Sequence, residues 1–186
     1  MDNRFKFFSS KQGPAYLINR KKIKDSRGNF ERLYCEKEFI KILKYKNIKQ
    51  INRALTKKKA TIRGMHYQVG GNFEDKIVSC LKGRVYDVTI DLRKNSKNFL
   101  KWYGKILDSK SSYSNYVPYG FAHGYQTLTD ECEMIYFHTD FYYKNRSKII
   151  NCFDPKIGID WPLKNSLIIS KKDKEMKFID NKFKGI

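Results

Sequence analysis

The chain has 186 residues, of which 40% are hydrophobic and 15% aromatic, so it is long enough to bury one core and too apolar to be disordered. Its 39 basic and 19 acidic side chains give a formal net charge of +20, which keeps a nucleic-acid partner open as an alternative through phosphate contacts. Lysines are spread along the whole chain, however, and no helix-turn-helix, zinc finger or RNA-recognition motif accompanies them, so nucleic-acid binding is the less favoured function.

No repeat, linker or change of composition divides the sequence, and we expect residues 1–186 to form a single domain. The four cysteines are far apart and contain no Cys-x-x-Cys pair, which argues against a zinc knuckle or a disulfide framework and favours a reducing cytoplasm. The N-terminus lacks the apolar segment of a signal peptide, and no stretch approaches the roughly 18 apolar residues of a membrane-spanning helix. We therefore expect a soluble, cytoplasmic protein without a membrane partner.

The spacing of apolar residues predicts one helix in the first half of the chain, followed by strands. Glu36 to Lys46 has apolar side chains at helical spacing, and Thr61 to Gln68 is rich in β-forming residues. Arg84 to Leu92 alternates between apolar residues on one face and polar residues on the other, as a strand does. Because only Lys82-Gly83 separates it from the apolar run Ile77 to Leu81, we expect these two strands to form a tight hairpin.

Further strands are predicted in the second half, at Trp102 to Leu107, Tyr116-Val117, Gly124 to Leu128 and Glu133 to Thr139. Many short strands joined by turns rich in Gly, Asn, Asp and Ser favour a mainly β fold, a sandwich or barrel of the jelly-roll type. Near the end of the chain, Ser170 precedes Lys171-Lys172-Asp173, a pattern that predicts the start of a short terminal helix.

The chain has three histidines, His66, His123 and His138, and the first two lie in distinctive surroundings. A histidine that a strand holds in place is a candidate general base, because its proton equilibrium lies near neutral pH. Strict alternation would place His66 on the face of Gly64 and Gln68, where the glycine leaves room for a ligand. A histidine hydrogen-bonded inside a polar core is an equally good interpretation of the local sequence.

A metal site is the second functional interpretation. Pro118 to His123 resembles the second metal-binding motif of the cupins, whereas the first motif, which usually has two histidines one residue apart, is His66-Tyr67-Gln68 here. The asparagine expected four residues after the second-motif histidine is Thr127. With Glu74 as an extra ligand, a site of two histidines and one carboxylate stays open as an alternative.

Taken together, the motifs resemble the dTDP-4-dehydrorhamnose 3,5-epimerase family, which consists of metal-free cupin-fold enzymes of nucleotide-sugar metabolism. The similarity is carried by Asp25-Ser26-Arg27-Gly28, Gln50-Ile51-Asn52, Arg63 to Gln68, Lys76, Gly83 to Arg93, Pro118 to Gly124, Tyr136, Asp154-Pro155, Gly158 to Pro162 and Ser170 to Asp173. It implies a cupin-type jelly-roll sandwich or barrel with a few short flanking helices, one of them C-terminal. It also implies that neither a metal nor an organic cofactor is needed.

The resemblance implies four catalytic residues. His66 corresponds to the base that removes a proton next to the 4-keto group, and Asp173 to the carboxylate that orients this histidine. Lys76 corresponds to the cation facing the enolate oxygen, and Tyr136 to the acid that returns a proton on the opposite face of the sugar. From the residues alone, Asp173 is also interpretable as a helix cap, Lys76 as a solvated lysine and Tyr136 as a core residue.

The implied substrate-binding residues include a tyrosine that stacks on the base, and they are Arg27, Gln50, Asn52, Arg63, His123, Tyr142 and Lys172. The basic members suit a diphosphate by charge and hydrogen-bond geometry. Asp87 is a further polar position, which we expect only to support the site. The family forms dimers, so we expect a homodimer in which Arg27 of one subunit reaches the site of the other.

Three departures from the family pattern concern the nucleotide side. Arg32 stands where a glutamate is common, Ile23 replaces a phenylalanine that helps to enclose the base, and a binding glutamate is absent near Asn145-Arg146-Ser147. The catalytic set is intact. The sequence therefore predicts a nucleotide-sugar epimerase that acts on a dTDP-linked 4-keto-6-deoxyhexose and inverts C3, C5 or both, in deoxysugar supply for a surface polysaccharide.

Overall fold

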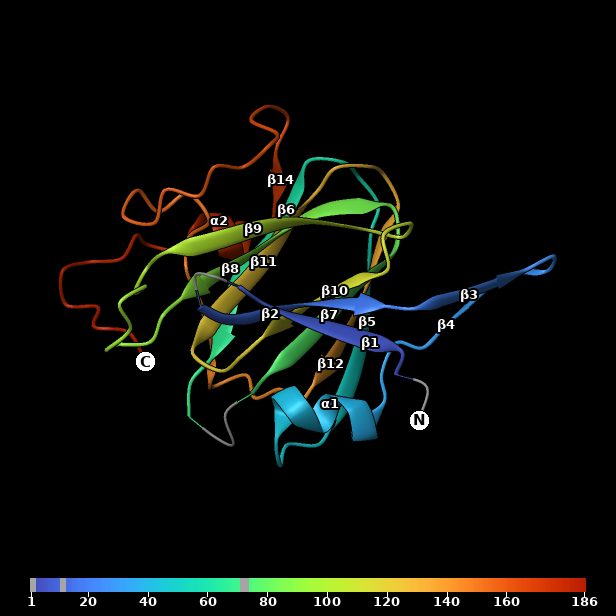
Figure 1. Ribbon diagram of the computed structural model, residues 1–186. Helices are drawn as coiled ribbons and strands as arrows, with labels where there is room; N and C mark the ends of the chain where they lie inside the picture. The colour runs from blue at the N-terminus through green and yellow to red at the C-terminus, as the bar shows by residue number, and fades with distance from the viewer. Residues whose placement is uncertain (1–2, 11–12, 71–73) are drawn as a thin grey trace.

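The computed structural model describes residues 3–10, 13–70 and 74–186, which form a β-sandwich of two sheets (Figure 1). Sheet I contains, in spatial order, β1 (Phe5–Ser10), β2 (Gly13–Arg20), β10 (Tyr113–Val117), β7 (Lys76–Lys82), β12 (Cys132–His138) and β5 (Gln50–Thr56). Sheet II contains β13 (Ser147–Ile149), β6 (Thr61–Gln68), β11 (Phe121–Thr127), β8 (Arg84–Asp91) and β9 (Trp102–Asp108), with β14 (Ile168–Ile169) parallel to the strand of His66. The predicted mainly β sandwich is confirmed.

Two short helices flank the sandwich in the described residues. α1 (Glu36–Leu43) begins as predicted but ends earlier, where Lys44 adopts a positive φ of 57°. α2 (Lys171–Lys174) is the predicted C-terminal helix, and the Ser170 hydroxyl caps it by accepting a hydrogen bond from the backbone N–H of Asp173. No helix in these parts of the chain is long and apolar enough to cross a membrane.

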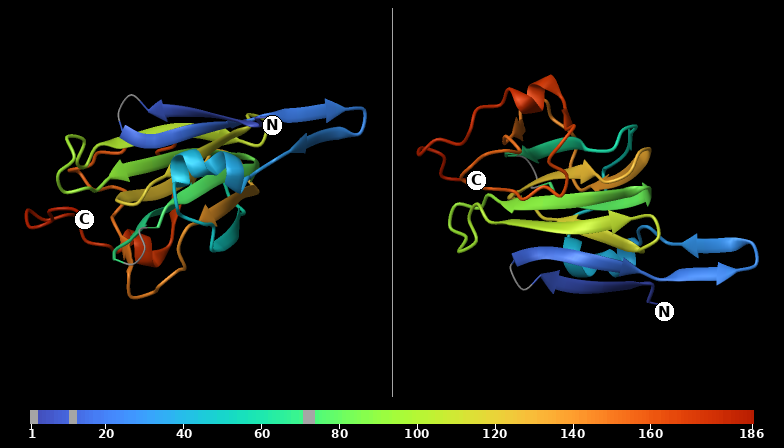
Figure 2. Two further views of the ribbon diagram at one scale, coloured as in Figure 1. Left: turned by 60° about the horizontal axis from the view of Figure 1, so that its bottom comes forward. Right: turned by 90° about the horizontal axis from the view of Figure 1, so that it is seen from above.

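A two-stranded hairpin projects away from the sandwich in every view (Figures 1 and 2). It consists of β3 (Lys22–Asp25) and β4 (Gly28–Glu31), which pair only with each other. Its cross-strand neighbours Ile23 and Phe30 are 40% and 63% exposed. An isolated two-stranded hairpin is only marginally stable in water. Burial of these two exposed apolar side chains against another surface would therefore stabilise the hairpin.

Three apolar cores hold the layers together. One lies between the two sheets and includes Val78, Val85 and Met134. A second lies on the outer face of sheet I, where α1 packs Phe39 over it. The third lies on the outer face of sheet II, where Trp161 in the C-terminal segment is 2% exposed. Both outer faces are covered only in part, since Ile51 and Leu55 on β5 remain 57% and 41% exposed.

The predicted hairpin of Ile77 to Leu81 with Arg84 to Leu92 is wrong. β7 lies in sheet I between β10 and β12, whereas β8 lies in sheet II between β11 and β9, so the chain crosses the sandwich at Gly83. Gly83 has a φ of +78°, and a Cβ there would lie 2.7 Å from the Cys132 Sγ. Most residues of both strands are buried. A central position in a sheet buries a strand more completely than an exposed hairpin would, which agrees with the place of each strand in its own sheet.

The strict alternation expected for β6 is also wrong, because a bulge interrupts it. His66 pairs with His123 and Arg63 pairs with Tyr125, so two residues of β6 oppose one residue of β11. The bulge turns Arg63 and His66 toward the same side, where both line one cavity. The backbone of β11 fills the space beside Gly64 and leaves no room there for a ligand. A Cβ on Gly64 would lie 2.7 Å from the Gly124 Cα and 2.8 Å from the His123 carbonyl oxygen.

This close approach of β6 and β11 predicts the effect of a single methyl group. Gly64→Ala should lower the free energy of unfolding by roughly 3 kcal/mol or more, since backbone atoms cannot move away from the added Cβ. Gly70→Ala is the matched control, because Gly70 also has a positive φ but has no heavy atom within 4 Å of the added Cβ. Gly70→Ala should lower the free energy of unfolding by about 1 kcal/mol, as expected for a residue with a side chain at a positive φ. Urea unfolding measures both, and equal losses would contradict the packing account.

Candidate active site

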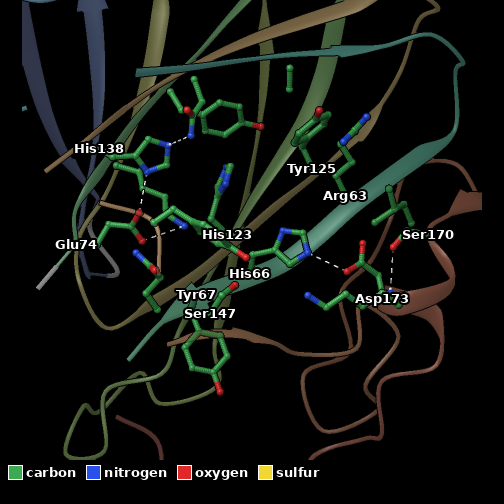
Figure 3. A pocket seen from close by; sticks show the side chains of 18 of the residues that line it. Arg63, His66, Tyr67, Glu74, His123, Tyr125, His138, Ser147, Ser170 and Asp173 are labelled. Atoms are coloured by element: carbon green, nitrogen blue, oxygen red, sulfur yellow. Dashed lines mark hydrogen bonds and ion pairs between the residues drawn. The ribbon is translucent and has the colours of Figure 1, made fainter. Parts of the chain in front are cut away.

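A cavity of about 590 Å³ opens between the two sheets (Figure 3). Every predicted site residue except Arg27 lines it, that is His66, Lys76, Tyr136, Asp173, Gln50, Asn52, Arg63, His123, Tyr142 and Lys172. These side chains come from both sheets, from the loop after β12 and from α2, over more than a hundred positions of sequence. The structure therefore brings together residues that no local pattern connects.

His66 and Asp173 form a hydrogen-bonded pair, with 2.8 Å between Nε2 and Oδ1. Burial alone would raise the pKa of the Asp173 carboxyl, but the hydrogen bond and charge of His66 outweigh it and lower that pKa. An ionised carboxylate only accepts, so Nε2 carries the hydrogen and Nδ1 of the neutral ring keeps a lone pair. Asp173 caps α2 through its backbone N–H at the same time, so both interpretations of this residue hold together.

The second pair, His123 and Asp87, is deeper. Nε2 of His123 lies 2.7 Å from Oδ2 of Asp87, and the two side chains are 4% and 0% exposed. The Asn115 amide donates to the other Asp87 oxygen at 2.7 Å. A carboxylate with both oxygens occupied holds the His123 ring in one orientation, and a supporting role for Asp87 in the site stays a prediction.

Sequence reasoning missed the role of the third pair, His138 and Glu74, which lies on the opposite side of the cavity from His66 (Figure 3). Nδ1 of His138 lies 2.8 Å from Oε1 of Glu74, and Nζ of Lys76 lies 3.5 Å from Oε2. Burial would raise the pKa of Glu74, but the hydrogen bond from His138 and the charge of Lys76 lower it. A usable signal existed, because His138 is two residues from Tyr136 and therefore shares its strand face.

Tyr136 lies between two of these histidines. Its ring centroid is 6.1 Å from that of His123, edge to face, and 6.0 Å from that of His138, at an interplanar angle of 22°. Burial, followed by the nearby Tyr125 and Asp87, raises the pKa of Tyr136 well above that of an ordinary phenol. The hydroxyl is therefore protonated at neutral pH and able to donate. Tyr125, another cavity residue that the sequence did not indicate, is 1% exposed and hydrogen-bonded to Thr56 at 2.9 Å.

Arg27 does not line this cavity. It lies in the turn of the projecting hairpin, where its guanidinium binds Asp25 at 2.6 Å and its side chain is 87% exposed. Two of the departures from the family pattern also lie outside the cavity lining: Ile23 is on the same hairpin, and Arg32 binds Glu38 at 3.3 Å.

No group of three His, Cys, Asp or Glu side chains is arranged to hold a metal ion in the described residues. His66 and His123, the two histidines of the metal-site alternative, each bond instead to a different carboxylate, Asp173 and Asp87. Glu74, which the alternative used as a third ligand, bonds to His138.

A β-sandwich whose interior cavity combines histidine–carboxylate pairs, a lysine and a protonated phenol fits an enzyme of the cupin fold. The sequence model of the dTDP-4-dehydrorhamnose 3,5-epimerase family matches residues 12–181. The chain belongs to this family, and it is an isomerase, a nucleotide-sugar epimerase of deoxysugar biosynthesis. The cupin-type sandwich expected from the resemblance is confirmed by the same comparisons.

Individual relatives agree with this assignment. The dTDP-4-dehydrorhamnose 3,5-epimerase of Shigella flexneri is 36% identical over 90% of this chain and 93% of its own. The crystal structure of the enzyme from Elizabethkingia anophelis has a TM-score of 0.89 and 33% identity, over 97% of this chain and 100% of that one. The Legionella pneumophila dTDP-6-deoxy-D-glucose-3,5-epimerase, in complex with dTDP-4-keto-L-rhamnose, has a TM-score of 0.88 and 31% identity, over 94% and 92%.

The lowered pKa of Asp173 predicts how its contribution to stability depends on pH. A carboxyl whose pKa is lower in the folded than in the unfolded state stabilises the fold above the unfolded pKa, about 3.9. That stabilisation is lost as the pH falls through the folded value. Asp173→Asn should therefore destabilise the protein most near neutral pH, and the difference from wild type should shrink below about pH 4. Urea unfolding from pH 3 to 7 measures it, and a difference that grows on acidification would contradict the pairing.

Proposed function

We propose that the cavity inverts C3, C5 or both of a dTDP-linked 4-keto-6-deoxyhexose, with His66 as base and Tyr136 as acid. The observation that carries the proposal is that a histidine with a free Nδ1, a lysine and a protonated phenol line one cavity while each histidine is held by a carboxylate. C3 and C5 flank the ketone at C4, so a hydrogen on either carbon is acidic enough for removal by an imidazole.

In the first step, Nδ1 of His66 takes the proton from the carbon next to the ketone. The electron pair of the broken C–H bond forms the enolate, and the imidazole becomes imidazolium. Ionised Asp173, at 2.8 Å from Nε2, stabilises that new positive charge without taking the proton itself. Asp173 therefore acts through His66 by orienting the ring and favouring its charged form.

The enolate places negative charge on the oxygen at C4, and we assign its stabilisation to Lys76. The Lys76 side chain is 13% exposed, so little water screens its ammonium group. A fixed cation aimed at developing charge typically contributes several kcal/mol to the transition state, on the order of 10²–10³ in rate. Glu74 lies on the far side of that ammonium and balances it before the substrate binds.

In the second step, the Tyr136 hydroxyl donates its proton to the opposite face of the same carbon. The enolate electrons form the new C–H bond, and the configuration is inverted. The tyrosinate then regains a proton and His66 loses one, so the two groups return to their starting states with no net change in protons. His66 belongs to sheet II and Tyr136 to sheet I, and a sugar between the sheets meets them from two sides.

The remaining predicted residues suit the nucleotide diphosphate. Arg63 and Lys172 carry positive charge at the cavity. Tyr142 also lines the cavity and is 56% exposed, so its ring is available to stack on a base. Gln50 and Asn52 add amide donors and acceptors on β5. We assign the enzyme to the cytoplasm, where all four unpaired cysteines would stay reduced.

We also propose a homodimer in which the β3–β4 hairpin of one subunit reaches the cavity of the other. Among the predicted binding residues, only Arg27 does not line the cavity of its own subunit. It lies on the hairpin that projects from the sandwich (Figure 2). The exposed Ile23 and Phe30 give this hairpin apolar surface to bury against a second copy. Each complete site would then combine residues of both subunits.

The chemistry is tested by incubation of the enzyme with dTDP-4-keto-6-deoxyglucose in deuterated water, with NMR detection at C3 and C5. Wild type should introduce deuterium and invert the carbon that exchanges. His66→Ala should slow exchange about 10³-fold, as expected for loss of a general base. Tyr136→Phe should retain exchange but lose inversion, because His66 can return deuterium to the face from which it took the proton. Absence of exchange at both carbons in wild type would overturn the proposal.

The dimer is tested by mixing two inactive variants, Arg27→Ala and His66→Ala, after reversible dissociation. If Arg27 acts across the interface, a mixed dimer contains one site with both residues intact, and up to about half the activity per mixed dimer returns. If Arg27 acts within its own subunit, every site lacks one of the two residues and the mixture stays inactive. Sedimentation equilibrium checks that mixed dimers form.

A further inference from the structure

A chain of hydrogen bonds that ends in one ion pair lines the cavity on the side of sheet I, and Figure 3 labels its members His138 and Glu74. The backbone N–H of Tyr142 donates to Oε1 of Gln50 at 3.1 Å, and Nε2 of Gln50 donates to Oδ1 of Asn52 at 3.1 Å. Nδ2 of Asn52 lies 3.2 Å from Nε2 of His138, whose Nδ1 lies 2.8 Å from Glu74. Lys76 completes the chain at 3.5 Å from the second Glu74 oxygen.

The Asn52 NH₂ group faces Nε2 of His138, which gives this chain a single direction. Ionised Glu74 only accepts, so Nδ1 of His138 must carry a hydrogen, and with Nδ1 protonated in a neutral ring Nε2 is an acceptor. An acceptor there requires the Asn52 NH₂ group rather than its oxygen, and this turns the Asn52 oxygen toward the Gln50 NH₂ group. The Gln50 oxygen is left for the Tyr142 N–H, which can only donate.

If one member of the chain exchanges its donor and acceptor atoms, the chain breaks at the Tyr142 end. With a hydrogen on Nε2 of His138, the amide groups of Asn52 and then of Gln50 would have to rotate by half a turn. The Gln50 NH₂ group would then face the backbone N–H of Tyr142, and two donors cannot bond. The charged and titratable groups around the His138 ring are Glu74 and Lys76 from the β7 side and Tyr136 from its own strand, whereas β5 offers only the two uncharged amides.

We propose that Glu74 and His138 are positioning residues: together they fix which amide atoms Gln50 and Asn52 present to the nucleotide and hold the ammonium group of Lys76 at the enolate side. One buried pair thereby sets both the binding end and the catalytic end of the cavity. The inference rests on the proposed function for Gln50, Asn52 and Lys76, and it assigns roles to two residues that the sequence motifs left without one.

The first test needs no nucleotide. Protein labelled with ¹⁵N-histidine should show His138 with a hydrogen on Nδ1 and a bare Nε2 at neutral pH, and the signal is assigned by its loss in His138→Phe. The opposite tautomer, or an imidazolium ion, would overturn the proposal even if the enzyme proved to use another substrate.

The second test is the affinity for dTDP, measured by calorimetry. His138→Phe keeps an aromatic ring beside Tyr136 but offers Asn52 no acceptor, so the Kd should rise about fivefold or more, the worth of one hydrogen bond. Glu74→Gln should raise the Kd similarly, because a carboxamide can donate to Nδ1 and allow the reversed chain. It should also lower kcat, since Lys76 loses its ionic anchor. The double variant should bind no more weakly than either single variant, because both act through one unit.

The matched control is Glu133→Gln, which neutralises a carboxylate on the same strand, β12, paired with exposed Arg53 at 2.8 Å outside the cavity. It should leave Kd and kcat at wild-type values, and thermal unfolding checks that all variants fold. Unchanged affinity in folded His138→Phe, or additive losses in the double variant, would overturn the positioning role. If wild type fails to exchange deuterium while His138 shows the expected tautomer, the proposed reaction fails and the orientation of the chain stands.

Discussion

Buried negative charge is the constraint on which the site depends. Asp87, Glu74 and Asp173 are all less than a tenth exposed, and an ionised carboxylate in such a place is costly unless hydrogen bonds and opposite charge satisfy it. Each of the three histidines supplies one such bond, at 2.7 or 2.8 Å. The carboxylates in return fix the ring orientations and tautomers. Stability and preparation for proton transfer are therefore two results of the same pairs.

The sandwich accommodates these buried histidine–carboxylate pairs because its apolar core and its polar cavity occupy separate parts of the interior. Core packing between the sheets is concentrated around residues such as Val85 and Met134, and α1 and the C-terminal segment each cover part of one outer face. The β6 bulge then turns Arg63 and His66 into the remaining interior space. A regular strand would have left one of these two side chains on the opposite face, so the bulge that brings Gly64 against Gly124 also places both side chains at the cavity.

The sequence predicted the strands from β6 to β12, both helices and ten of the twenty residues that line the cavity, because alternation, capping and the family motifs are local signals, but it did not predict β1 to β5, β13 or β14. It failed where a neighbour in space decides the outcome. The two-residue spacing before Arg84 suggested a hairpin, but the partners of β7 and β8 come from distant strands. The bulge depends on the backbone of Gly124, and the importance of Glu74 depends on His138, 64 positions away. Arg27 lies outside the cavity of its own chain, so its predicted binding role depends on the proposed dimer.

The order in which the chain is made gives the His66–Asp173 bond another meaning. The two residues are separated by 107 positions, and Asp173 is held by a helix that begins at Lys171. During synthesis on the ribosome, the sheets and their apolar cores can begin to assemble while the base still lacks the carboxylate that orients it. Under the proposed mechanism, the nascent chain therefore gains its full activity only after α2 has emerged and Asp173 has reached His66.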